Sequence, residues 1–103
     1  MANPRTARKH AIQRLKSRQG VKDISLVKDI VAEVLKNGTR VKDYPESCAA
    51  DLEVKTLLFK KFKSNTQRKR TYVYKDNVYI FNKENVLITT YPLTFIRRKV
   101  YDK

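Results

Sequence analysis

Several residue types are scarce in this chain of 103 residues, and each scarcity excludes a kind of site. Cys48 is the one cysteine, so no internal disulfide can form and there is no Cys/His zinc pattern. The only glycines are Gly20 and Gly38, which excludes a glycine-rich phosphate-binding loop. The ten acidic residues are scattered without the spacing of metal ligands. We therefore expect neither a metal ion nor a small-molecule cofactor.

Long apolar runs are also missing. No segment approaches the length of a membrane span, and the basic N-terminal run lacks an apolar signal core. We therefore expect a cytoplasmic protein with no membrane partner. The length matches the commonest size of one domain, so we expect a single domain over residues 1–103.

Positive charge is abundant. Lysine and arginine number 24 against ten acidic residues, giving a net charge of +14, which repels itself unless a polyanion neutralises it. The cations form three clusters, which are Arg5, Arg8, Lys9, Arg14, Lys16 and Arg18, then Lys60, Lys61, Lys63, Arg68, Lys69 and Arg70, then Arg97, Arg98 and Lys99. A fold could gather these clusters on one face, where the phosphate backbone of a nucleic acid is their natural counterpart.

Apolar periodicity predicts two N-terminal helices. Residues 7–19 carry a narrow apolar stripe, and Gly20 is a plausible stop. A second helix begins near Asp23 or Ser25 and ends before Gly38. Its apolar positions follow the i, i+3, i+4, i+7 spacing, at Ile24, Val27, Ile30, Val31, Val34 and Leu35.

The C-terminal part reads as an antiparallel meander. Residues 71–75 and 78–82 form a hairpin with a tight turn at Asp76-Asn77, and residues 86–91 form a third strand that Pro92 ends. We expect a short strand at residues 39–44, and residues 94–101 could add an edge strand or a basic tail.

The middle of the chain, residues 45–69, reads as a variable insertion. We favour a helix over a strand for residues 46–64 and a basic loop for residues 64–70. The predicted fold class is therefore α+β, with two helices packed on one face of a sheet of three to four strands and the other face free.

One group of residues could carry chemistry. His10 is the only histidine and stands one helical turn before Arg14 and two before Arg18, so it is the obvious general acid or base. Strand alternation places Leu87, Thr89 and Tyr91 on one face of the third strand. Hydroxyl groups beside a histidine and arginines could orient a ribose or hold a phosphate.

These residues carry a resemblance. The segment His-Ala-Ile-Gln-Arg-Leu at residues 10–15 with Arg18, the helix at residues 30–35 before Asn37-Gly38, and Val-Leu-Ile-Thr-Thr-Tyr-Pro at residues 86–92 resemble a family of small bacterial and phage proteins. That family is grouped with the barnase, EndoU, colicin and RelE-like toxin fold. The resemblance covers roughly residues 7–44 and 70–93 and implies metal-independent RNA cleavage or RNA binding.

On the matching positions the resemblance makes His10 the acid or base, Arg14 the phosphate holder, and Thr89 and Tyr91 the strand residues that face the site. Lys9, Arg18 and Tyr91 would be helpers.

Three functions stay open. The first is a toxin-type endoribonuclease. The second is a non-catalytic nucleic-acid-binding module that stacks bases on Tyr72, Tyr74 or Tyr79. The third is a phage or mobile-element protein that binds an acidic antitoxin or host protein. The predicted contacts with nucleic acid are Arg8, Lys9, Arg18, Lys61, Lys63, Arg68, Lys69 and Arg70.

Overall fold

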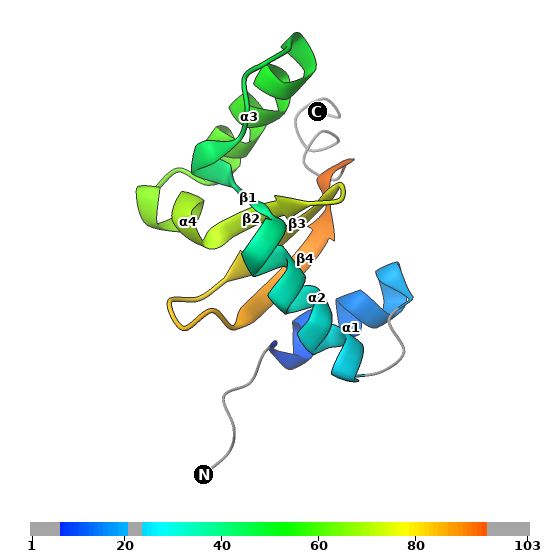
Figure 1. Ribbon diagram of the computed structural model, residues 1–103. Helices are drawn as coiled ribbons and strands as arrows, with labels where there is room; N and C mark the ends of the chain where they lie inside the picture. Colours follow the sequence, from blue (N-terminus) through cyan, green and yellow to red (C-terminus); the bar gives the residue numbers. More distant parts are fainter. Residues whose placement is uncertain (1–6, 21–23, 95–103) are drawn as a thin grey trace.

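A computed structural model describes residues 7–20 and 24–94 (Figure 1). The helices are α1 (Lys9–Gln19), α2 (Ile24–Asn37), η1 (Val41–Asp43, a 3-10 turn), α3 (Ala49–Lys61) and α4 (Asn65–Arg70). The strands are β1 (Thr39–Arg40), β2 (Thr71–Tyr74), β3 (Asn77–Phe81) and β4 (Leu87–Pro92). They form one antiparallel sheet in the order β1-β2-β3-β4. The predicted α+β class is therefore confirmed.

Glycines end both N-terminal helices, as the sequence indicates. Gly20 has a φ of 68°, and its N–H bonds to Leu15 O, which is the left-handed stop that favours glycine. Gly38 follows α2, and its N–H donates to Val34 O at 2.7 Å. A Cβ at Gly38 would stand 2.5 Å from that same oxygen, so the close approach itself requires glycine.

The helix α3 fills the centre of the insertion, which confirms helix over strand for Ala49–Lys61 within the predicted range 46–64. The expected loop at residues 64–70 is wrong, because most of it forms α4. Ser64 caps this helix: its Oγ accepts from Gln67 N at 3.1 Å, and the Gln67 side chain accepts from Ser64 N. This reciprocal capping box offsets the poor intrinsic helicity of a six-residue, strongly basic segment.

The hairpin turn differs by one residue from the prediction. Lys75 and Asp76, with φ values of 46° and 64°, connect β2 and β3, as a primed turn requires. The expected turn residue Asn77 instead begins β3 and pairs with Tyr74.

A bulge in β4 changes which faces its side chains occupy. Ile80 pairs with Thr89, but Phe81 pairs with Leu87, so Ile88 is an extra residue. Leu87 therefore points to one face of the sheet while Thr89 and Tyr91 point to the other. The prediction that all three share a face is wrong for Leu87, because it assumed unbroken alternation.

The sheet separates two hydrophobic cores. The first core lies under α1 and α2 and comprises Ala7, Ala11, Leu15, Val27, Val31, Val34, Tyr72, Tyr79, Phe81 and Leu87. The second core comprises Val41, Val54, Leu57, Leu58, Phe62, Val73, Val78, Tyr91 and Leu93. The expectation that one sheet face is free is wrong, because the apolar side of α3 and Phe62 cover it.

In the described part of the chain, no helix combines the length and the hydrophobicity that crossing a membrane would require. Arg5 and the third cationic cluster, Arg97, Arg98 and Lys99, lie outside the described residues, as does the predicted edge strand or tail after Thr94.

Candidate nucleic-acid interface

The outer side of α1 is a cationic surface. Ala7, Ala11 and Leu15 recur every four residues and are buried against the sheet, so the opposite side of the helix faces solvent. That side carries what we call the α1 surface, which consists of Arg8, Lys9, His10, Arg14 and Lys16. No acidic residue occurs between residues 7 and 20, so nothing on this helix neutralises it. The side chain of Arg18 lies outside the described part.

His10 and Arg14 form a pair on this surface. Arg14 Nε donates to His10 Nε2 at 2.6 Å, across one exposed helical turn. In this hydrogen bond His10 Nε2 is the acceptor. The terminal nitrogens of Arg14 make no hydrogen bond within the described residues and can meet a phosphate. The predicted neighbourhood of His10 and Arg14 is therefore present.

Thr89 and Tyr91 lie elsewhere. They pair with Ile80 and Val78 on the sheet face of the second core, whereas α1 packs on the face of the first core. Burial raises the pKa of Tyr91 to about 12. The structure thus brings α1 beside β4 but does not bring Thr89 and Tyr91 to the His10–Arg14 pair.

Thr90 is the β4 hydroxyl on the α1 side. It pairs with Tyr79 of the first core, is only 1% exposed, and its Oγ1 has no hydrogen-bond partner in the described part of the chain. Sequence reasoning passed over Thr90, because the family resemblance directed attention to Thr89 and Tyr91.

The second predicted cluster forms another cationic surface around the junction of α3 and α4. We call it the α4 surface; it consists of Lys60, Lys61, Lys63, Lys69 and Arg70. Lys60, Lys63, Lys69 and Arg70 make no ion pair or side-chain hydrogen bond with other described residues. Lys61 Nζ stands 5.8 Å from the centre of the Tyr91 ring.

Arg68 belongs to the same cluster but has a structural role. Its Nε donates to Phe62 O at 2.6 Å and its Nη2 donates to Phe59 O at 3.1 Å. Its guanidinium also lies 4.0 Å from the centre of the Phe59 ring. The planar fork of Arg68 therefore satisfies carbonyls at the C-terminal end of α3 and fixes α4 against it.

A groove of about 200 Å³ borders the α4 surface. Ile80 of β3 and Phe62 contribute apolar lining, while Arg70 and Gln67 of α4 provide polar groups. An apolar wall beside an arginine suits a flat base whose phosphate neighbours the guanidinium.

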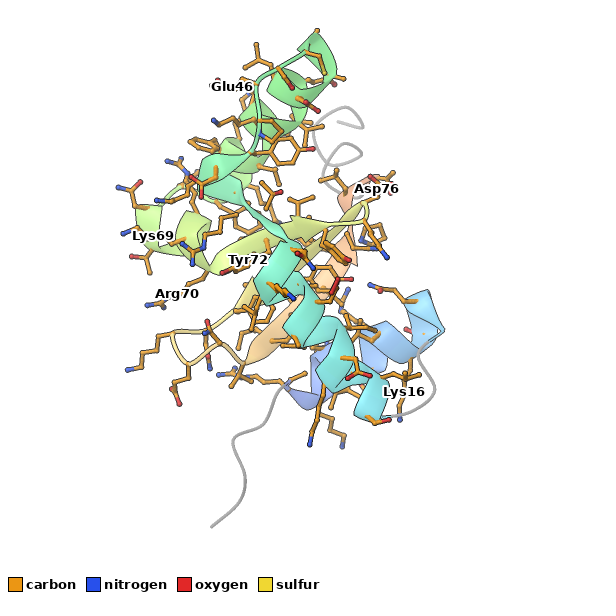
Figure 2. All side chains as sticks on the ribbon, in the orientation of Figure 1. Lys16, Glu46, Lys69, Arg70, Tyr72 and Asp76 are labelled. Atoms are coloured by element: carbon orange, nitrogen blue, oxygen red, sulfur yellow. The ribbon has the colours of Figure 1, made fainter. Side chains whose placement is uncertain are left out.

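The two cationic surfaces lie at different edges of the sheet. The α4 helix contacts β1 and β2, whereas α1 contacts β4 at the other edge. Figure 2 accordingly shows Lys69 and Arg70 on the left of the molecule and Lys16 on the right. The first two clusters are therefore not gathered into one continuous patch.

The tyrosines that were predicted to stack with bases are largely buried. Tyr72 is 6% exposed and Tyr79 is 2% exposed, because both face the first core under α1 and α2. Stacking of bases on Tyr72 or Tyr79 is therefore wrong as a prediction. Tyr74 is half-buried at the end of β2 and keeps part of its ring accessible.

We found no match to this chain among models of protein families, among curated proteins or among solved structures. The resemblance to the RelE-like fold therefore stays a prediction. Function must be inferred from the described residues.

Proposed function

We propose that the protein binds single-stranded RNA, with the phosphate backbone held on the α1 and α4 surfaces. The observation that carries this proposal is a set of cations close to the junction of α3 and α4. None of them forms an ion pair with another described residue: Lys60, Lys63, Lys69 and Arg70. The ion pair between Lys55 Nζ of α3 and Glu46, which precedes α3, at 3.6 Å, involves none of these four cations. Such a concentration of positive charge repels itself, and a bound polyanion would relieve that repulsion.

The groove beside Arg70 supports a single-stranded ligand. A groove of this size can admit one base. In a duplex that base would be stacked and paired, so it could not enter the groove, whereas a base of a single strand can. The preference for RNA over DNA follows the RelE-like resemblance, so single-stranded DNA is an arm of the test.

The test is anisotropy of labelled single-stranded RNA, and of single-stranded DNA of the same sequence, at several salt concentrations; equal affinity for both would contradict the preference for RNA. The logarithm of the affinity should fall linearly with the logarithm of salt, by roughly 0.7 per neutralised phosphate. The triple variant Lys63→Ala, Lys69→Ala, Arg70→Ala should lower the slope by about 2.

A matched control removes the same charge elsewhere, through Lys28→Ala, Lys36→Ala and Lys83→Ala, which are exposed. Equal losses in both triple variants would show that net charge alone binds RNA and would overturn the assigned surface. Absence of RNA binding by the wild-type protein would overturn the function, and capture of a partner that survives nuclease treatment would favour an acidic protein instead.

Toxin-type endoribonuclease activity is a second candidate, and the His10–Arg14 pair favours it. Once a phosphate draws Arg14 away, His10 Nε2 could accept the proton of a ribose 2′-hydroxyl as the 2′-oxygen attacks phosphorus, while the guanidinium stabilises the phosphorane. The bond from phosphorus to the 5′-oxygen then breaks, and water protonates the departing oxygen. Incubation of mixed RNA in chelator with the wild type and with His10→Ala decides this candidate. Cleavage retained in His10→Ala would remove His10 from the mechanism, and intact RNA with the wild type would leave binding alone.

A further inference from the structure

A groove between the end of α1, the face of α2 and the β2–β3 hairpin has no role in the proposal above. It measures about 580 Å³, within the range of small-molecule sites. Its lining includes Asp29 and Glu33 of α2, Tyr74 and Tyr79 of the sheet, Gln19 of α1, and Asn77. Asp76, labelled in Figure 2, marks the hairpin turn beside it. This α2 groove is acidic and aromatic in a chain that is otherwise strongly basic.

Hydrogen bonds within the α2 groove occupy some of its polar atoms and leave other donors and acceptors able to bind a ligand. The Tyr79 hydroxyl donates to Gln19 Oε1 at 3.2 Å, so the amide nitrogen of Gln19 keeps its two donors. Asn37 Nδ2 donates to Glu33 Oε1 at 2.7 Å, which leaves the other carboxylate oxygen able to accept. The Asp29 carboxylate makes no hydrogen bond or ion pair with other described residues. The groove thus offers carboxylate oxygens as acceptors together with the N–H donors of one amide group, that of Gln19.

Among the four RNA bases, guanine fits this inventory. Its Watson–Crick edge presents two adjacent donors, N1–H and the N2 amino group, next to the O6 acceptor. A carboxylate can take both donors at once, while the Gln19 amide can donate to O6. Adenine, cytosine and uracil each place a ring acceptor or a carbonyl where the second donor is needed, so a carboxylate would repel them.

Charge also favours a neutral base over a cationic side chain. The net charge of +14 repels a cation at long range, whereas a base is neutral and its phosphate is attracted. Gln19 follows Arg14 by five residues, which corresponds to about 7.5 Å of rise and about 140° of rotation along α1. A strand with a phosphate at Arg14 must therefore bend around the end of α1 to place a base at Gln19.

We propose that the α2 groove binds a guanine base of single-stranded RNA, with Glu33 and Asp29 accepting its Watson–Crick donors and the Tyr74 ring providing a stacking surface. This proposal rests on the proposed function. Lys75 Nζ lies over the Tyr74 ring, 5.4 Å from its centre, so this side chain must move aside for a base to stack there and can then meet the phosphate of that nucleotide.

The test compares oligoadenylates that carry one central guanosine, one inosine, or adenosine throughout. Inosine lacks the N2 amino group and differs from guanosine in nothing else. The wild type should prefer the guanosine oligonucleotide by at least about fivefold over both others. Glu33→Gln and Asp29→Asn should lose this preference without loss of affinity for oligoadenylate. The control Glu84→Gln makes the same charge change in the β3–β4 turn and should keep the preference.

A second measurement separates this proposal from the function on which it rests. Guanosine monophosphate should shift the NMR signals of Tyr74 and Tyr79, and Glu33→Gln should abolish the shifts. Equal affinity for all three oligonucleotides would overturn guanine binding and leave RNA binding intact. Shifts with the nucleotide but no RNA binding would keep the groove and overturn the function. Shifts with an arginine amide instead of the nucleotide would identify a cation site and overturn the proposal.

Discussion

Replacement of Arg68 by alanine separates a structural arginine from a ligand-binding one. Sequence reasoning predicts that Arg68 contacts nucleic acid, yet its fork bonds to Phe62 O and Phe59 O and stacks on the Phe59 ring. If these contacts are its main role, Arg68→Ala should destabilise the fold. Its effect on RNA binding by molecules that remain folded should be small.

The size of the effect follows from the interactions that the Arg68 guanidinium makes. Each hydrogen bond from a charged donor contributes about 1.5 kcal/mol at the lower end of the usual range, which suits a half-buried site. The cation–π contact contributes about 0.5–1 kcal/mol. Water can hydrate part of the exposed carbonyls after substitution, so we expect a loss of about 2–3 kcal/mol. For a domain of this size that corresponds to a fall in Tm of roughly 10–20 °C.

The assay pairs thermal and urea unfolding with RNA anisotropy at a temperature where both variants are folded. The matched control is Lys69→Ala, the neighbouring exposed cation, which should change stability by less than about 0.5 kcal/mol and should weaken RNA binding. The reverse pattern, with Arg68→Ala as stable as the wild type but poor in RNA binding, would refute the structural role of Arg68.

Three further predictions concern the close approach at Gly38, the burial of Leu58 and the ionisation of Tyr91. Gly38→Ala would put a Cβ 2.5 Å from Val34 O, so urea unfolding should show a loss of about 1–3 kcal/mol; an unchanged midpoint would contradict that close approach. Leu58→Ala, fully buried in the second core, should cost about 2–5 kcal/mol, and Leu52→Ala, 49% exposed, less than about 0.5 kcal/mol. Equal costs would contradict coverage of that sheet face by α3. Burial raises the pKa of Tyr91 to about 12, so its contribution to stability is complete below about pH 10 and is lost as pH rises toward 12. Tyr91→Phe should reduce that loss in unfolding curves measured across this range, and identical curves would contradict burial of the phenol.

The elements that the sequence predicts well are those with long, regular patterns. The helix α2 follows from six apolar positions at helical spacing, and the meander follows from short β-prone runs separated by polar turns. The short helix α4 is different, because its six residues are polar throughout and show no amphipathic period. Its one recognisable signal is the Ser64-x-x-Gln67 spacing of a capping box, which could have identified it.

The candidate site was less predictable for a physical reason. A single extra residue in β4, Ile88, reverses the face of Leu87 relative to Thr89 and Tyr91, and nothing in the alternating apolar pattern announces it. The His10–Arg14 pair follows from i, i+4 spacing alone and was predictable. Local geometry was therefore accessible from the sequence, whereas the side of the sheet that each helix covers was not.

The same limit applies to cations. A run of lysines and arginines shows where positive charge is dense but not which guanidinium is already used, as the contacts of Arg68 demonstrate. Nor does such a run show which carboxylates form no ion pair. Asp29 stays without an ion pair in the described part of a chain with 24 lysines and arginines, while nearby Lys75 stands over the Tyr74 ring instead. Asp29 is exposed, so water solvates its carboxylate and a lysine partner would contribute little to stability. Charge density along the sequence therefore shows neither which guanidinium is already bonded nor which carboxylate is left unpaired.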